Sequence, residues 1–223
     1  MKIEEIENLM DKFYDLDSDV EDQIFEELLK FANNDKEGFI NYVNAQKLDN
    51  DSYRPIIYQA LMENAVGWED FLLDQIKFIM EASESGGKDA TDEISNIFYL
   101  VNIKDLAKSF YTAGIDYLEP KLNSRNIAVR KAALEYIVDL HFGGNITMKP
   151  KLKNELQTQL KDQIYTVRLS AYLNLKTGKL LPAGYKQSII DKIRYLLSSD
   201  YRTYRKIKKM GEEIADQAMK NDL

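Results

Sequence analysis

Apolar residues recur along this chain at the three- and four-residue spacing that places them on one face of an α-helix. A clear example is the stretch 127–142, whose apolar residues share such a face: Val129, Ala132, Ala133, Tyr136, Ile137 and Leu140. The spacing predicts pairs of helices. The first helices of the pairs cover 2–15, 36–47, 69–83, 104–122, 150–161 and 183–198, and the second helices cover 18–32, 51–65, 90–102, 127–142, 164–176 and 200–219.

A short phrase returns at a fixed distance within the second helices. Arg130 and Arg168 each belong to the phrase Val-Arg-x-x-Ala. Arg54 precedes Arg130 by twice the distance that separates Arg130 from Arg168, and Arg205 follows Arg168 at nearly that same distance. A period of about 38 residues predicts a repeat protein in which each helix pair is one unit.

A turn that contains Asp, followed by Val-Arg-x-x-Ala on a second helix, resembles the HEAT-repeat family of α-solenoids. Asp162, six residues before Arg168, matches this pattern most closely, whereas Ser124 stands at the same place before Arg130. The resemblance implies an all-α fold: a right-handed α-α superhelix (an α-solenoid) of about six HEAT-like helix pairs in a single domain, 1–223. Its units cover about 2–32, 36–65, 69–102, 104–142, 150–176 and 183–219.

The resemblance also implies a role for the recurring arginines. In resembling proteins, such arginines bind turn carboxylates of their own or of the neighbouring unit. We therefore expect a structural ladder formed by Arg54, Arg130, Asp162 and Arg168. Contact of these arginines with a ligand is the alternative. Tetratricopeptide repeats fit less well, because their period is about 34 residues.

Charge is unevenly distributed along the 223 residues, which carry a net charge of −7. Residues 1–100 contain 8 Lys and Arg against 24 Asp and Glu, whereas residues 101–223 contain 22 against 13. This asymmetry either reflects ordinary solvated surfaces or indicates that the two halves face different partners, because such fields steer association.

The composition bears on the cellular compartment of the protein and on the chemistry open to it. The chain contains no cysteine, which excludes disulfides and thiolate chemistry. It has no run of the roughly 20 apolar residues that a membrane-spanning helix needs, and its acidic start is unlike a signal peptide. We therefore expect a cytoplasmic protein with no membrane partner.

No group of residues predicts a catalytic centre. His141 is the only histidine, so a histidine-pair metal site is excluded. The run that begins at Asp15 imitates a calcium loop, but Val20 occupies the sixth position, where the sharp turn needs glycine. We expect no cofactor, no metal and no catalytic residue. Enzyme activity stays undecided, with a non-enzyme favoured.

Aromatic and apolar residues of the second helices form the first candidate surface, because resembling solenoids place these helices on their concave face. Tyrosine suits interface cores, since it offers a large apolar area and one hydroxyl. The alternative is that these rings pack between stacked repeats. The candidate partner-binding residues are Phe25, Tyr58, Leu134, Tyr165, Tyr172 and Tyr201.

Basic residues near the end of the chain form the second candidate surface. Lysine and arginine beside tyrosine can contact phosphates while the rings stack on bases. Some HEAT-like solenoids of about this length are alkylpurine DNA glycosylases, although their catalytic residues have no counterpart here. The candidate basic patch consists of Arg168, Arg202, Arg205, Lys206, Lys208 and Lys209.

These observations favour a non-enzymatic protein–protein interaction module, that is, an adaptor, scaffold or immunity-type binder that uses a curved solenoid surface. Its expected partner is another protein. The second hypothesis is a nucleic-acid-binding HEAT-like protein related to the alkylpurine DNA glycosylases. The third hypothesis is a lyase that acts on a tetrapyrrole. Only the expected fold supports it, and no particular residue does.

Overall fold

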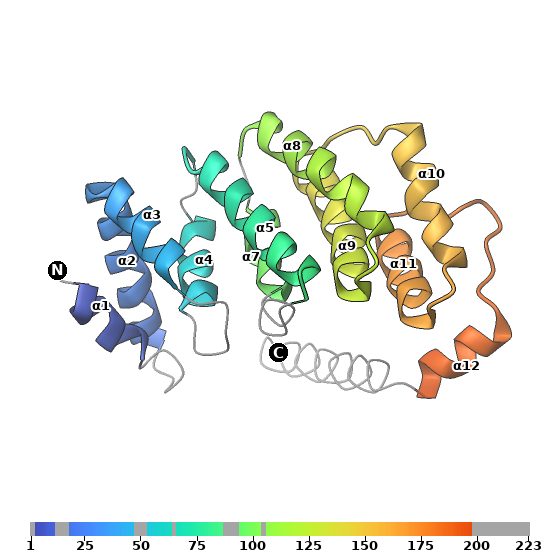
Figure 1. Cartoon of the computed structure of the whole chain (residues 1–223), viewed down its shortest axis with the longest axis horizontal. Helices are drawn as coiled ribbons and strands as arrows, with labels where there is room; N and C mark the ends of the chain where they lie inside the picture. Colours follow the sequence, from blue (N-terminus) through green and yellow to red (C-terminus); the bar gives the residue numbers. More distant parts are fainter. Residues whose placement is uncertain are drawn as a thin grey trace, which may run out of the picture.

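The computed structural model describes residues 3–11, 18–46, 53–63, 66–86, 94–103 and 106–197. This part of the chain is all-α, with about ten helices packed together and no strand. Figure 1 shows the helices following one another in chain order, from α1 beside the N-terminus to α11 and then α12.

The helices lie where the apolar spacing predicts them. The α-helices of the described residues are α1 (Ile3–Met10), α2 (Ser18–Asn34), α3 (Lys36–Ala45), α4 (Arg54–Glu63), α5 (Glu69–Glu84), α7 (Ile97–Val101), α8 (Lys108–Leu118), α9 (Ile127–Gly143), α10 (Pro150–Thr158), α11 (Tyr165–Thr177) and α12 (Ile189–Leu197). Three short 3-10 helices accompany them: η2 (Ile94–Asn96), η3 (Glu119–Asn123) and η4 (Gln159–Lys161).

Each helix packs mainly against helices that are close to it along the chain. Helix α2 packs against α3 and α4, α5 packs against α7 and α8, and α9 packs against α7, α8 and α11. Helix α10 packs against α11. These contacts place the apolar core between neighbouring helices from α1 to α11 (Figure 1).

Helix α9 lies at the centre of this packing. The sequence assigns it one apolar face, yet Leu134 and Val138 are also buried, outside that face. The reason is that four α-helices (α5, α7, α8 and α11) and the 3-10 helices η2 and η3 contact α9, and a helix that is surrounded in this way is apolar around most of its circumference.

Local signals fix several helix ends. The carboxylate of Asp35 accepts a hydrogen bond from the Gly38 amide at 2.9 Å, which caps α3. The side chain of Asn126 accepts from the Ala128 amide at 2.9 Å and so caps α9. Pro150 occupies the first turn of α10, as its position in the sequence predicts.

Two predicted first helices begin later than expected. The helix predicted over 104–122 begins at Lys108, and the helix predicted over 183–198 begins at Ile189. In the second case Gly184 has φ +72 within a turn, and the Ser188 hydroxyl then accepts a hydrogen bond from the Asp191 amide at 3.1 Å. That contact caps α12 at Ser188. The helix predicted over 200–219 lies outside the described residues.

The helices are short. The longest in the described ranges are α2 and α9, each with 17 residues. Within those ranges, no helix is both long and apolar enough to cross a membrane.

The crossing of α8 and α9 depends on a glycine. A Cβ atom placed on Gly114 would lie only 2.7 Å from Cδ1 of Leu140. Leu140 is fully buried, so its side chain has little room to move away. The absence of a side chain at position 114 lets the two helices approach closely.

We therefore expect Gly114→Ala to destabilise the fold, although alanine is the better helix former. The added methyl group should overpack the crossing at a cost of about 1–3 kcal/mol, which exceeds the roughly 0.5–1 kcal/mol that alanine contributes to helix stability. Urea unfolding measures the difference. The matched control is Thr112→Ala on the exposed side of α8, which should change stability by less than about 0.5 kcal/mol. An increase in stability for Gly114→Ala would show that Leu140 yields easily.

Candidate functional site

The structure divides the predicted partner-binding residues into two groups. Tyr58 and Leu134 are both 0% exposed, so the expectation that they contact a partner is wrong for the described conformation. They lie one turn beyond an arginine, and that turn faces the neighbouring helices. Phe25, Tyr165 and Tyr172 are partly exposed, so partner contact stays a prediction for them. Tyr201 lies outside the described residues.

The partly exposed tyrosines of α11 already contact residues of their own region. The ring of Tyr172 lies 6.3 Å from that of Tyr185, and the Lys176 ammonium lies 5.7 Å from the Tyr172 ring. The guanidinium groups of Arg168 and Arg194 lie 5.9 and 5.5 Å from the ring of Tyr165. These contacts fit the packing role that the sequence left open as an alternative.

Arg168 is the one predicted basic-patch residue that lies in the described part of the chain. Its Nε and Nη2 donate to the two carboxylate oxygens of Asp191 at 3.0 and 2.8 Å. This two-pronged hydrogen bond lowers the pKa of the Asp191 carboxyl. Arg168 is therefore used within the fold. The other predicted basic-patch residues lie outside the described residues: Arg202, Arg205, Lys206, Lys208 and Lys209.

The recurring arginines share one contact with the chain that precedes their own helix. Arg130 donates to the Ser124 carbonyl at 3.1 Å, and Arg168 donates to the Asp162 carbonyl at 2.8 Å. Since the acceptor is a backbone carbonyl six residues earlier, serine serves at this place as well as aspartate. Arg54 donates in a similar way to the Gln46 carbonyl at 3.0 Å.

Each of these arginines also contacts a side chain of the following helix pair. That side chain lies on the first helix of the pair or directly after it. Arg130 lies 3.6 Å from the carboxylate of Asp162, which follows η4, and Arg168 binds Asp191 on α12. Arg54 donates to Oε1 of Gln75 on α5 at 2.6 Å. The Asp162 carboxylate accepts from the Ile164 amide at 2.7 Å, so Asp162 meets Arg168 through its carbonyl and Arg130 through its carboxylate.

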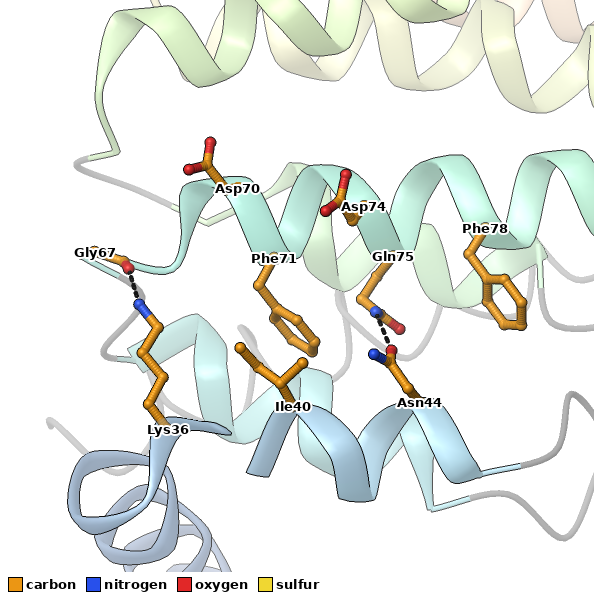
Figure 2. A pocket seen from close by; sticks show the side chains of 9 residues that line it. All are labelled: Lys36, Ile40, Asn44, Gly67, Asp70, Phe71, Asp74, Gln75 and Phe78. Carbon is orange, nitrogen blue, oxygen red and sulfur yellow. Dashed lines mark hydrogen bonds between the residues drawn. The ribbon is translucent and has the colours of Figure 1, made fainter. Parts of the chain in front are cut away.

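A groove between α3 and α5 is the candidate functional site. It encloses about 550 Å³ and is lined by Lys36, Ile40, Asn44, Gly67, Asp70, Phe71, Asp74, Gln75 and Phe78. Figure 2 shows that Ile40 and Asn44 on α3 point toward Phe71 and Gln75 on α5.

The groove is built from two stripes at helical spacing. Positions 36, 40 and 44 follow one another on one side of α3, and positions 71, 75 and 78 do so on one side of α5. The apolar part of the lining is Ile40, Phe71 and Phe78, and 44% of Phe78 is exposed. The groove therefore offers apolar surface to a ligand from both helices.

A buried polar cluster forms one end of the groove. Gln75 is 2% exposed, and its Nε2 donates to Oδ1 of Asn44 at 3.0 Å. Its Oε1 accepts from Arg54 at 2.6 Å and from the hydroxyl of Tyr58 at 3.0 Å. The guanidinium of Arg54 lies 5.1 Å from the ring of Phe78. Hydrogen bonds thus tie α3, α4 and α5 together beneath the groove.

The other end of the groove is closed by Lys36. Its ammonium donates to the Gly67 carbonyl at 2.7 Å and lies 4.6 Å from the ring of Trp68. Gly67 has φ +86, a conformation that favours glycine. Trp68 is 5% exposed and packs edge-on against Phe39 and Phe71 at 5.3 and 5.6 Å.

The geometry of this site suits binding. Among the described residues, no group of three or more His, Cys, Asp or Glu side chains is arranged to hold a metal ion. A concave apolar surface with a few fixed polar groups is the usual form of a binding site.

The comparisons with known proteins identify no relative: no family model, no curated protein and no solved structure matches the chain. The function is therefore argued from the geometry of the chain itself.

The sequence pattern did not predict the groove, because it placed binding on the second helices, whereas α3 and α5 are first helices. The sequence indicates that positions 36, 40 and 44 share one side of a helix. It does not indicate that positions 71, 75 and 78 on α5 face them across an open groove. It also missed an exposed apolar row on α12, whose members are Ile189, Ile190, Ile193 and Leu196.

The contact between Arg168 and Asp191 yields a test of how α12 is held. Asp191→Asn should weaken the attachment of α12 by about 1–3 kcal/mol, because a partly buried guanidinium loses its charged acceptor. Hydrogen exchange of 189–197 should become faster, while exchange in α9 should change little. The matched control is Asp116→Asn, whose carboxylate meets the exposed Lys149 at 3.4 Å and should contribute little.

The same contact has a defined pH dependence. The folded-state pKa of Asp191 lies below its ordinary value, so its contribution is present above about pH 4, the ordinary range of Asp, and is lost as the pH falls through the lowered folded value. Wild-type exchange in 189–197 should approach that of Asp191→Asn as the solution is acidified. Equal exchange of the two proteins at pH 7 would contradict the assignment.

Proposed function

We propose that this chain is a non-enzymatic protein-binding module built as an α-solenoid of HEAT-like helix pairs. The order of the helices supports the architecture, since each packs mainly on its neighbours along the chain. In a solenoid, each repeat contacts only adjacent repeats, and stacking buries one continuous core.

The arginines give this architecture its strongest support. Arg54, Arg130 and Arg168 each bond a carbonyl before their own helix and a side chain of the following first helix or its end. The same pair of contacts thus recurs with the sequence period, since Arg54 and Arg130 are two periods apart and Arg130 and Arg168 are one period apart. A contact that repeats with the sequence period is expected of equivalent units stacked in order.

The groove between α3 and α5 is the observation that carries the binding function. It presents apolar side chains from two successive first helices next to exposed carboxylates. Such a surface suits a polypeptide, which can bring apolar anchors together with polar flanks. It suits nucleic acid poorly, because carboxylates repel phosphates. The one described residue of the predicted basic patch, Arg168, lies elsewhere, on α11, and is bound to Asp191.

Affinity capture from a lysate of the native organism tests this proposal. We expect one polypeptide to be retained in stoichiometric amount, with or without nuclease treatment. The double variant Asp70→Lys with Asp74→Lys should reduce its capture at least about tenfold, which corresponds to roughly 1.4 kcal/mol. Tyr172→Ala tests the second-helix surface in parallel. Retention of material that disappears with nuclease, or retention of nothing, would contradict the proposal.

A further inference from the structure

We infer that the groove between α3 and α5 takes a positively charged, amphipathic segment of a partner protein. The segment would insert apolar side chains between the two helices and place Lys or Arg over Asp70 and Asp74. This inference rests on the proposed protein-binding function and specifies the chemistry of the partner.

The apolar requirement follows from the floor of the groove. Phe78 is an aromatic side chain with 44% of its surface in solvent. Ile40 is also partly exposed and lies beside Phe71, on the other side of the Asn44–Gln75 pair (Figure 2). Covering the exposed part of these side chains removes apolar surface from water, which favours association. A volume of about 550 Å³ lies within the roughly 300–1,000 Å³ of ordinary ligand sites.

The charge requirement follows from the charged side chains that line the groove, which are Asp70, Asp74 and Lys36. Both carboxylates are exposed. The ion pair of Asp74 with Lys77 at 3.1 Å is itself exposed to solvent, so it holds Asp74 only weakly. The Lys36 ammonium donates to the Gly67 carbonyl at the end of the groove. The groove therefore presents its two carboxylates as a negative rim to an approaching segment.

The spacing of the rim defines the pattern of the partner. Asp70 and Asp74 are both exposed and lie one helical turn apart on α5, which separates their Cβ atoms by about 5–6 Å. Two basic residues one turn apart on a partner helix match this separation. Amphipathic helices commonly bind apolar grooves in this way, with anchors at i and i+4.

Trp68 provides a reporter for the groove. It is the only tryptophan of the chain, and it lies beside Gly67 and Phe71, two of the lining residues. A segment that displaces the Lys36 ammonium from its ring, or that covers Phe71, will change its fluorescence. Binding at a distant surface will leave this signal unchanged.

Selection from a phage-displayed library of random 12-residue peptides tests the inference without knowledge of the natural partner. We expect the selected peptides to be enriched in Lys and Arg together with Leu, Ile or aromatic residues. A synthetic selected peptide should change Trp68 emission on binding. Its affinity should fall as salt is raised from about 0.05 to 0.5 M, because rim charges are screened over about 10 Å at 0.1 M.

Two variants and a matched control make the result specific. Asp70→Lys with Asp74→Lys should weaken peptide binding about tenfold or more, and Phe78→Ala should weaken it to a similar degree. The control is Asp22→Lys with Glu26→Lys on α2, two exposed acids at the same spacing, one of which meets Lys30 at 2.9 Å. The control changes the net charge equally and should leave the affinity within about twofold, since Asp22 and Glu26 do not line the groove and are solvated.

The failures of the two proposals are distinguishable. Selection of acidic or purely apolar peptides, or binding that leaves Trp68 unchanged, would overturn this inference. If the lysate partner were still captured, the proposed protein-binding function would stand with another surface. Self-association in sedimentation that is abolished by Asp70→Lys with Asp74→Lys would assign the groove to a second copy of the chain and would also overturn the inference.

Discussion

A buried guanidinium group is the constraint around which this fold is arranged. Arg54 is fully buried, and a charge removed from water must be surrounded by hydrogen-bond acceptors or it destabilises the fold strongly. Its acceptors are the Gln46 carbonyl before α4, the Tyr58 hydroxyl one turn further along α4, and Oε1 of Gln75 on α5. Apolar packing alone has little directional preference. Directional bonds of this kind fix how far one helix lies along the next.

The same constraint shapes the groove. At Arg130 and Arg168 the side chain reached in the next first helix or its end is a carboxylate, whereas at Arg54 it is the amide of Gln75. An amide can accept and donate at once. Gln75 accepts a hydrogen bond from Arg54 and donates one to Asn44. The residue that connects α4 to α5 therefore also connects α5 to α3, the two walls of the groove.

The sequence predicted the helices well and their surfaces poorly. Spacing identifies an apolar face, but it does not say how many neighbours cover a helix, and so Tyr58 and Leu134 were expected at a surface although they are buried. The repeat phrase identified Arg130 and Arg168. The phrase did not reveal that each arginine donates to a backbone carbonyl, Arg130 to that of Ser124 and Arg168 to that of Asp162. The side chain at that position is therefore irrelevant to the bond. The start of α12 was missed because a local turn at Gly184 and the Ser188 cap set it, whereas α8 begins at Lys108 without a side-chain cap.

The groove illustrates why a site of this kind escapes sequence reasoning. Its residues are ordinary, and only the separation of α3 from α5 makes them a site. Once formed, its parts have different physical roles. In the proposed complex, rim carboxylates such as Asp70 and Asp74 would act at a distance and govern mainly the rate of encounter and its dependence on salt. Ile40 and Phe78, the apolar lining residues that are at least partly exposed, would act only after contact and govern mainly the lifetime of that complex. A partner selected for this groove must therefore meet both conditions at once, positive charge for approach and apolar anchors for retention, because neither set of residues can replace the other.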